Sequence, residues 1–64
     1  MNPETQKAVE RLDELAYLLE GHAPKEMVHA ICSVSERLEQ GFFPLADALI
    51  YIHAVEMTLP VYLG

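Results

Sequence analysis

The chain has 64 residues, and its 10 acidic and 4 basic side chains give a net charge of −6 at pH 7. A chain of this length forms a single domain, residues 1–64, with a small core, and its negative surface repels nucleic-acid phosphates and anionic lipid. Its one cysteine excludes an intrachain disulfide and is typical of a reducing compartment. We therefore expect a cytoplasmic protein that binds neither nucleic acid nor membrane directly and is stabilised by oligomerisation.

The first predicted helix spans residues 3–20. Asn2 is a favourable N-cap, Pro3 suits the first helical position, and Gly21 suits the position that follows a helix. At about 100° per residue, Leu18 falls on the outer side and the opposite arc is largely acidic. The pattern predicts an amphipathic helix. Its buried face consists of Ala8, Val9, Leu12, Leu15, Ala16 and Leu19.

The second predicted helix spans residues 24–40, from Pro24 to the residue before Gly41. Its apolar side chains form a narrow stripe with spacings of four, three and four, which is the pattern of a seam between two helices. The stripe consists of Met27, Ile31, Val34 and Leu38. Cys32 lies beside this stripe with Val28 and Ser35, and we interpret it as a semi-buried packing residue rather than a nucleophile.

The third predicted helix spans residues 44–59 and is apolar on almost every side. It cannot continue regularly past Pro60, so residues 60–64 form an apolar tail. A helix that is hydrophobic all round has to be buried all round. One face consists of Leu45, Ala48, Leu49, Ile52, Val55 and Leu59, and a second of Ala46, Ile50 and Met57.

These patterns predict an all-α fold of three short helices in an antiparallel bundle. The connections are only a few residues long, which favours antiparallel neighbours. The first two helices can cover one apolar face of the third, so we expect homodimerisation to cover the other. The predicted partner or dimer interface consists of Phe42, Phe43, Ala46, Ile50, His53, Glu56, Met57, Val61, Tyr62 and Leu63.

An apolar surface of this extent is typical of an interaction site. The chain shows no motif for a reaction, a cofactor, a phosphate or a small-molecule substrate. We therefore expect a non-enzymatic protein–protein interaction module without a cofactor. It would be a regulator, inhibitor or adaptor that binds a second copy of itself and another protein through the third helix.

Glu56 is the polar exception within the main apolar face of the third helix. A carboxylate there has to be protonated, paired, turned to an edge of the helix, or placed in an interface rather than in the monomer core. His53 lies one turn earlier and is its candidate partner. The functional interpretation is a polar residue that sets the register of an interface at some cost in stability.

Two alternative functions depend on polar residues. The acidic face of the first helix, formed by Glu10, Asp13, Glu14 and Glu20, resembles the charge of nucleic acid and predicts an antagonist of a DNA- or RNA-binding protein. A metal-binding helical protein is the other alternative, because Glu26–His29, His29–Cys32 and His53–Glu56 each place two ligand types one turn apart. The first helix offers no inward carboxylate to complete a di-iron site, so we expect no metal.

Overall fold

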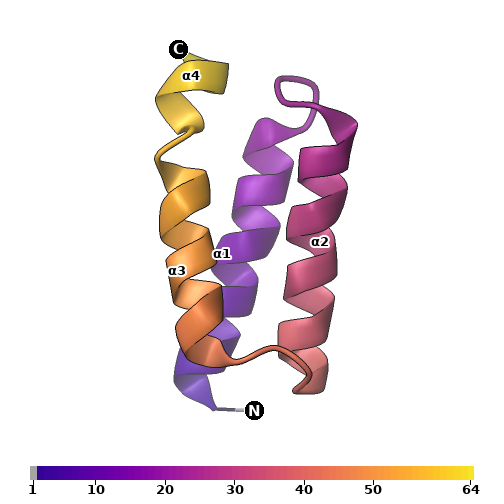
Figure 1. The fold of residues 1–64 in the computed structure, drawn as a ribbon, viewed down its shortest axis with the longest axis vertical. Coiled ribbons are helices and arrows are strands. Elements are labelled where there is room, and N and C mark those ends of the chain that lie inside the picture. The colour runs from indigo at the N-terminus through magenta and orange to yellow at the C-terminus, as the bar shows by residue number, and fades with distance from the viewer. Residues whose placement is uncertain (1) are drawn as a thin grey trace.

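The computed structural model describes residues 2–64, which form helices joined by short loops, with no strand among them. The helices are α1 (Pro3–Leu19), α2 (Lys25–Gln40), α3 (Leu45–Glu56) and α4 (Leu59–Leu63). Figure 1 shows α1, α2 and α3 side by side in alternating directions, with the short α4 above the end of α3. The bundle is elongated, with extents of 33 × 17 × 15 Å. The predicted all-helical fold of three packed helices is confirmed.

The ends of α1 and α2 follow the signals in the sequence. Asn2 Oδ1 accepts a hydrogen bond of 2.8 Å from the Glu4 backbone N–H, which satisfies a donor that the first turn leaves free. Gly41 has a φ of +85°, and the next backbone N–H donates to the Arg37 carbonyl at 2.7 Å. Only glycine adopts this left-handed conformation without strain, so Gly41 ends α2 where the sequence predicts.

The third helix is shorter than predicted. It ends at Glu56 rather than at residue 59, and the predicted tail is a separate helix, α4. Pro60 has no N–H to donate to the Glu56 carbonyl, and its ring clashes with that carbonyl in a continuous helix. The Thr58 hydroxyl donates to the Val55 carbonyl at 2.6 Å at the break. Pro60 then occupies the first turn of α4, where a proline is tolerated.

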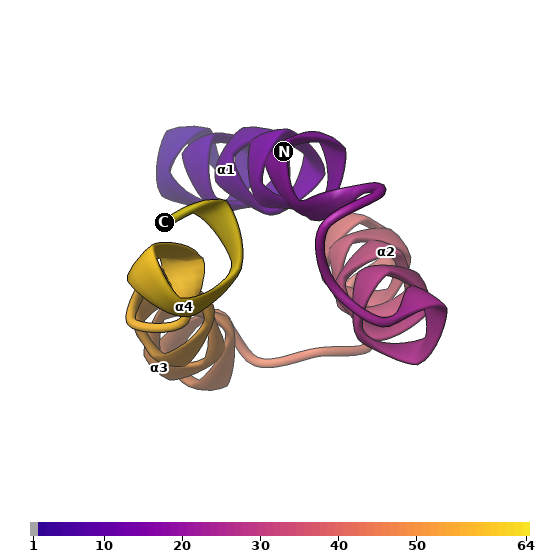
Figure 2. The same cartoon turned by 90° about the horizontal axis from the view of Figure 1, so that it is seen from above.

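The core lies around α1, which is the central helix of the bundle. Leu12, Leu15, Leu19 and Ile31 are its largest fully buried side chains. Figure 2 shows α1 beside both α2 and the α3–α4 column, and α2 and α3 contact each other less. All six residues predicted for the buried face of α1 are buried. The amphipathic pattern of α1 therefore determines how the other helices are arranged.

Two packing predictions need correction. Cys32 is exposed rather than semi-buried, because α2 turns the Ile31 and Leu38 side of its stripe toward the core. Leu49 is half-exposed rather than buried on the main face of α3. It lies at the edge of that face, where it lines an open groove of about 290 Å³ with Lys7, Arg11 and other residues of α1.

We expect Leu12→Ala to unfold most of the protein. Removing a fully buried leucine side chain costs about 2–5 kcal/mol, which is comparable with the whole stability of about 3–5 kcal/mol that a core of this size provides. Urea denaturation followed by circular dichroism measures the loss. The matched control is Leu18→Ala on the outer side of α1, which should change stability by less than about 1 kcal/mol. Equal losses of unfolding free energy in the two variants would contradict the placement of Leu12 in the core and of Leu18 outside it.

Candidate interaction surface

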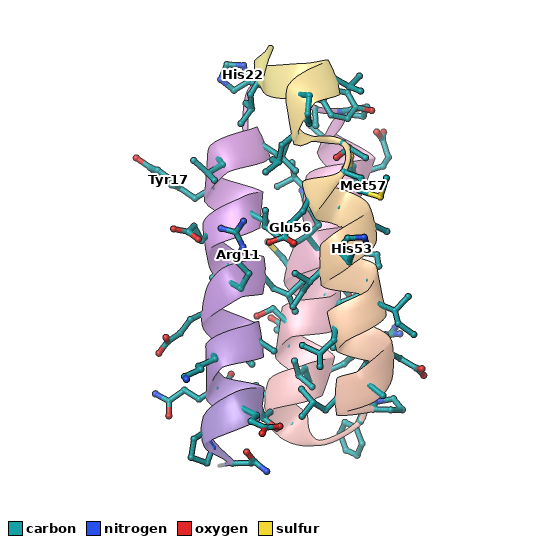
Figure 3. All side chains as sticks on the ribbon, turned by 90° about the vertical axis from the view of Figure 1, so that its left-hand side faces the viewer. Arg11, Tyr17, His22, His53, Glu56 and Met57 are labelled. Atoms are coloured by element: carbon teal, nitrogen blue, oxygen red, sulfur yellow. The ribbon has the colours of Figure 1, made fainter. Side chains whose placement is uncertain are left out.

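The side of α3 that faces solvent carries an apolar stripe. We define the α3 stripe as Ala46, Ile50, His53 and Met57, whose spacings of four, three and four place them on one side of the helix. All four are exposed, and Ile50 and Met57 each expose 69% of their surface. In Figure 3, Glu56 turns toward Arg11 of α1, whereas His53 and Met57 project from α3 away from Arg11. The exposed residues of the stripe therefore lie on the side of α3 that faces solvent.

Exposed apolar residues continue beyond both ends of the α3 stripe. Phe42, before α3, is 78% exposed, and Val61, on α4, is 76% exposed. Six of the eight large hydrophobic residues that are exposed in the described chain lie between residues 42 and 63. The same segment contains no lysine or arginine and only two carboxylates, Asp47 and Glu56. The segment from residue 42 to residue 63 is thus rich in exposed apolar side chains and poor in charge.

The structure separates the predicted interface residues into two groups. Those that are exposed are Phe42, Ala46, Ile50, His53, Met57, Val61 and Leu63. Phe43, Glu56 and Tyr62 are half-buried, and Phe43 and Tyr62 pack against the core of their own chain. Leu59 packs there as well, so α4 lies against the bundle with one side and presents Val61 and Leu63 on the other.

Glu56 forms an ion pair with Arg11 rather than with His53, which corrects the predicted partner. The Arg11 Nε–H donates to Glu56 Oε2 at 2.8 Å, and Nη2 lies 2.8 Å from the same oxygen. A second carboxylate, Glu14, binds Arg11 Nη1. The hydrogen bond that Arg11 donates to Glu56 is the main cause that raises the pKa of Arg11, followed by the one that it donates to Glu14. Arg11 therefore joins the middle of α1 to the C-terminal end of α3.

Nothing in the sequence predicts the Arg11–Glu56 pair. Its members are 45 positions apart, and Arg11 falls on the outer side of α1 in a helical projection. His53 precedes Glu56 by three positions but lies toward solvent, because α3 turns Glu56 toward α1. The long arginine side chain reaches across the gap between two helices, which only their packing brings together.

A shallow hollow lies beside the α3 stripe. It has a volume of about 370 Å³ and is lined by Phe43, Asp47, Ile50, Tyr51 and Ala54. Tyr51 is half-buried there, and this burial raises the pKa of its phenol, since the phenolate loses hydration. The hollow is open and almost wholly apolar, which suits the side chain of a protein partner.

The predicted acidic face on α1 is partly engaged within the chain. All four carboxylates are exposed, but Asp13 accepts a hydrogen bond of 2.7 Å from the Ser35 hydroxyl and Glu14 binds Arg11. Glu10 makes a long contact of 3.4 Å with Gln6. The Asp13–Ser35 bond also satisfies the only polar residue buried among residues 2–64, where α1 meets α2.

No group of three or more histidine, cysteine or acidic residues is placed to hold a metal ion within residues 2–64. Glu26 and His29 are both exposed on α2. None of the helices described is long and apolar enough to cross a membrane.

Comparison of the chain with protein-family models, with curated proteins and with solved structures finds no significant match in any of the three. We therefore infer function from the geometry of the surface.

We expect a double-mutant cycle between Arg11→Met and Glu56→Gln to show a coupling below about 1 kcal/mol, because both side chains are about one-third exposed, at 35% and 36%. Salt should reduce it further. Urea denaturation of the four proteins measures the coupling. Glu14→Gln, which removes the other ion pair of Arg11 within one helix, is the control and should couple more weakly. A coupling energy of zero at low salt would contradict the ion pair between Arg11 and Glu56.

Proposed function

We propose that this chain is a small non-enzymatic protein–protein interaction module that forms a homodimer through the α3 stripe and its neighbours Phe42 and Val61. The observation that carries this proposal is that six of the eight large exposed hydrophobic side chains of the described residues lie between residues 42 and 63, a segment with no lysine or arginine and only two carboxylates. A contiguous apolar patch with few charges is typical of the centre of a protein interface.

The energetics of association support the proposal. Burying a side chain such as Ile50 or Met57 contributes about 1.5–3 kcal/mol, and a dimer buries each residue twice. Association costs roughly 4–15 kcal/mol in lost translational and rotational freedom. Four large residues on each copy, Phe42, Ile50, Met57 and Val61, are enough to offset a cost within this range. The stability gained is also what a 64-residue domain without a disulfide or a metal needs.

The surfaces left free by such a dimer support a role as a regulator, inhibitor or adaptor. Glu10 of α1 and Glu20 at the end of this other helix are exposed, so they stay available to a basic partner. An antagonist that acts only through this acidic face is the less supported alternative, because Asp13 and Glu14 are already engaged within the chain. A metal-binding function gains no support from the arrangement of residues 2–64.

We expect Ile50→Glu to abolish self-association while leaving the helices intact. A carboxylate at the centre of the α3 stripe loses its hydration when two copies meet, which costs more than the lost apolar contact alone. Light scattering on a sizing column over about a hundredfold range of concentration measures the molar mass, and circular dichroism checks the fold.

The matched control is Tyr17→Glu. Tyr17 is 79% exposed and projects from α1 into solvent in Figure 3, so its replacement also exchanges a large exposed apolar group for a carboxylate. This variant should associate like the original protein. A monomer at every concentration in the original protein, or a dimer that Ile50→Glu leaves unchanged, would contradict the proposed function.

A further inference from the structure

The four exposed residues of the α3 stripe have a symmetric spacing. They are residues 46, 50, 53 and 57, and the intervals of four, three and four read the same from either end. The centre of this series lies between residues 51 and 52, in the middle of α3. A surface with this symmetry matches itself when a second copy is turned end over end, which is the requirement of a two-fold interface.

Resting on the proposed function, we infer that two copies pack α3 against α3 in opposite directions, with the two-fold axis passing between the levels of Tyr51 and Ile52. Each stripe position then meets the position that lies equally far from the centre on the other copy. Ile50 contacts the partner's His53, and Ala46 contacts the partner's Met57.

The sizes of the paired side chains favour this antiparallel arrangement. Ala46 is the smallest residue of the α3 stripe and would receive Met57, a long and flexible side chain that fills irregular gaps. A parallel arrangement would instead place each residue against its own copy. It would leave a gap between two copies of Ala46 and stack two copies of His53 in the centre of an apolar contact.

The charges also favour a second copy as the occupant. Each chain carries −6, so two copies repel one another through most surfaces. On α3 the carboxylate of Glu56 is compensated by Arg11, which leaves Asp47 as the single uncompensated charge of this helix. In the antiparallel arrangement the two Asp47 residues are about 13 Å apart along the helix axis, at 1.5 Å per residue, whereas a parallel arrangement places them at the same level.

The area that a dimer needs is available on this side. A small specific interface buries about 600 Å² per partner, which is roughly one-seventh of the 4404 Å² that the chain exposes. The elongated bundle presents such an area along one long side. Leu49 at one edge of the α3 stripe and the hollow at Tyr51 at the other edge would widen the contact beyond a single row of residues.

Disulfide trapping tests the arrangement, with Cys32→Ser as the background because Cys32 is exposed. The variant Ala46→Cys with Met57→Cys places two thiols about 16 Å apart in one chain but opposite each other across the two-fold axis. It should form a covalent dimer at least about tenfold faster than either single variant, because a disulfide spans only about 4.4–6.8 Å between Cα atoms. Non-reducing electrophoresis and peptide mass spectrometry identify the product.

The single variants separate the outcomes. Rapid crosslinking of Ala46→Cys alone, or of Met57→Cys alone, indicates parallel helices and would overturn this inference while leaving the proposed homodimer intact. A dimer in solution that none of the three variants traps places the contact elsewhere and likewise overturns it. A monomer in solution would overturn both the inference and the proposed function. Circular dichroism of each variant shows whether the helices are retained, as the exposure of both positions predicts.

Exchanging the two side chains provides a test without cysteine chemistry. Ala46→Met alone places methionine opposite methionine in both 46–57 pairs and should weaken the dimer by about tenfold, since overpacking a contact is destabilising. Adding Met57→Ala to the same chain restores one small and one large residue in each pair, so affinity should return to within about threefold of the original. Additive losses in the double variant would show that residues 46 and 57 do not meet, and would overturn the arrangement.

Discussion

The burial of one face of α1 is the interaction on which the rest of the structure depends. α1 contacts both α2 and α3, while these two contact each other less. Leu12, Leu15 and Leu19 therefore act as a common core for the whole chain. A single central helix can cover only one side of each neighbour. For α2 this is sufficient, because its other side is polar, whereas α3 is apolar on both sides and keeps one of them in solvent.

The ion pair between Arg11 and Glu56 adds orientation to this packing rather than much stability. Both side chains are partly solvated, so the attraction between them is modest. Its geometric effect is larger, because Glu56 lies next to Met57 at the end of α3 and is held toward α1. Ala48, Ile52 and Val55 are buried on the side of α3 that faces the bundle, and the residues of the α3 stripe are exposed. The Glu56 carboxylate, which is the polar exception in an apolar face of α3, thus belongs to the contact between α3 and α1.

The break before α4 has a similar role at the end of the column. Pro60 prevents a continuous helix, and the short α4 packs Leu59 and Tyr62 on the core of its own chain. The apolar tail is thus divided between the monomer core and the exposed side that carries Val61. Six of the eight large exposed hydrophobic side chains of the described residues therefore lie between residues 42 and 63.

Local signals in the sequence determined the helices, because capping residues, glycines and the periodicity of apolar residues act within a few positions of one another. They were sufficient for the ends of α1 and α2 and for the buried face of α1. They also indicated that α3 has two apolar faces. The tertiary structure decided which residues of those faces are exposed, where Leu49 and Cys32 lie, and that Arg11 rather than His53 binds Glu56. These features depend on distances between helices that are remote in the chain, and such distances are set by packing of the whole core.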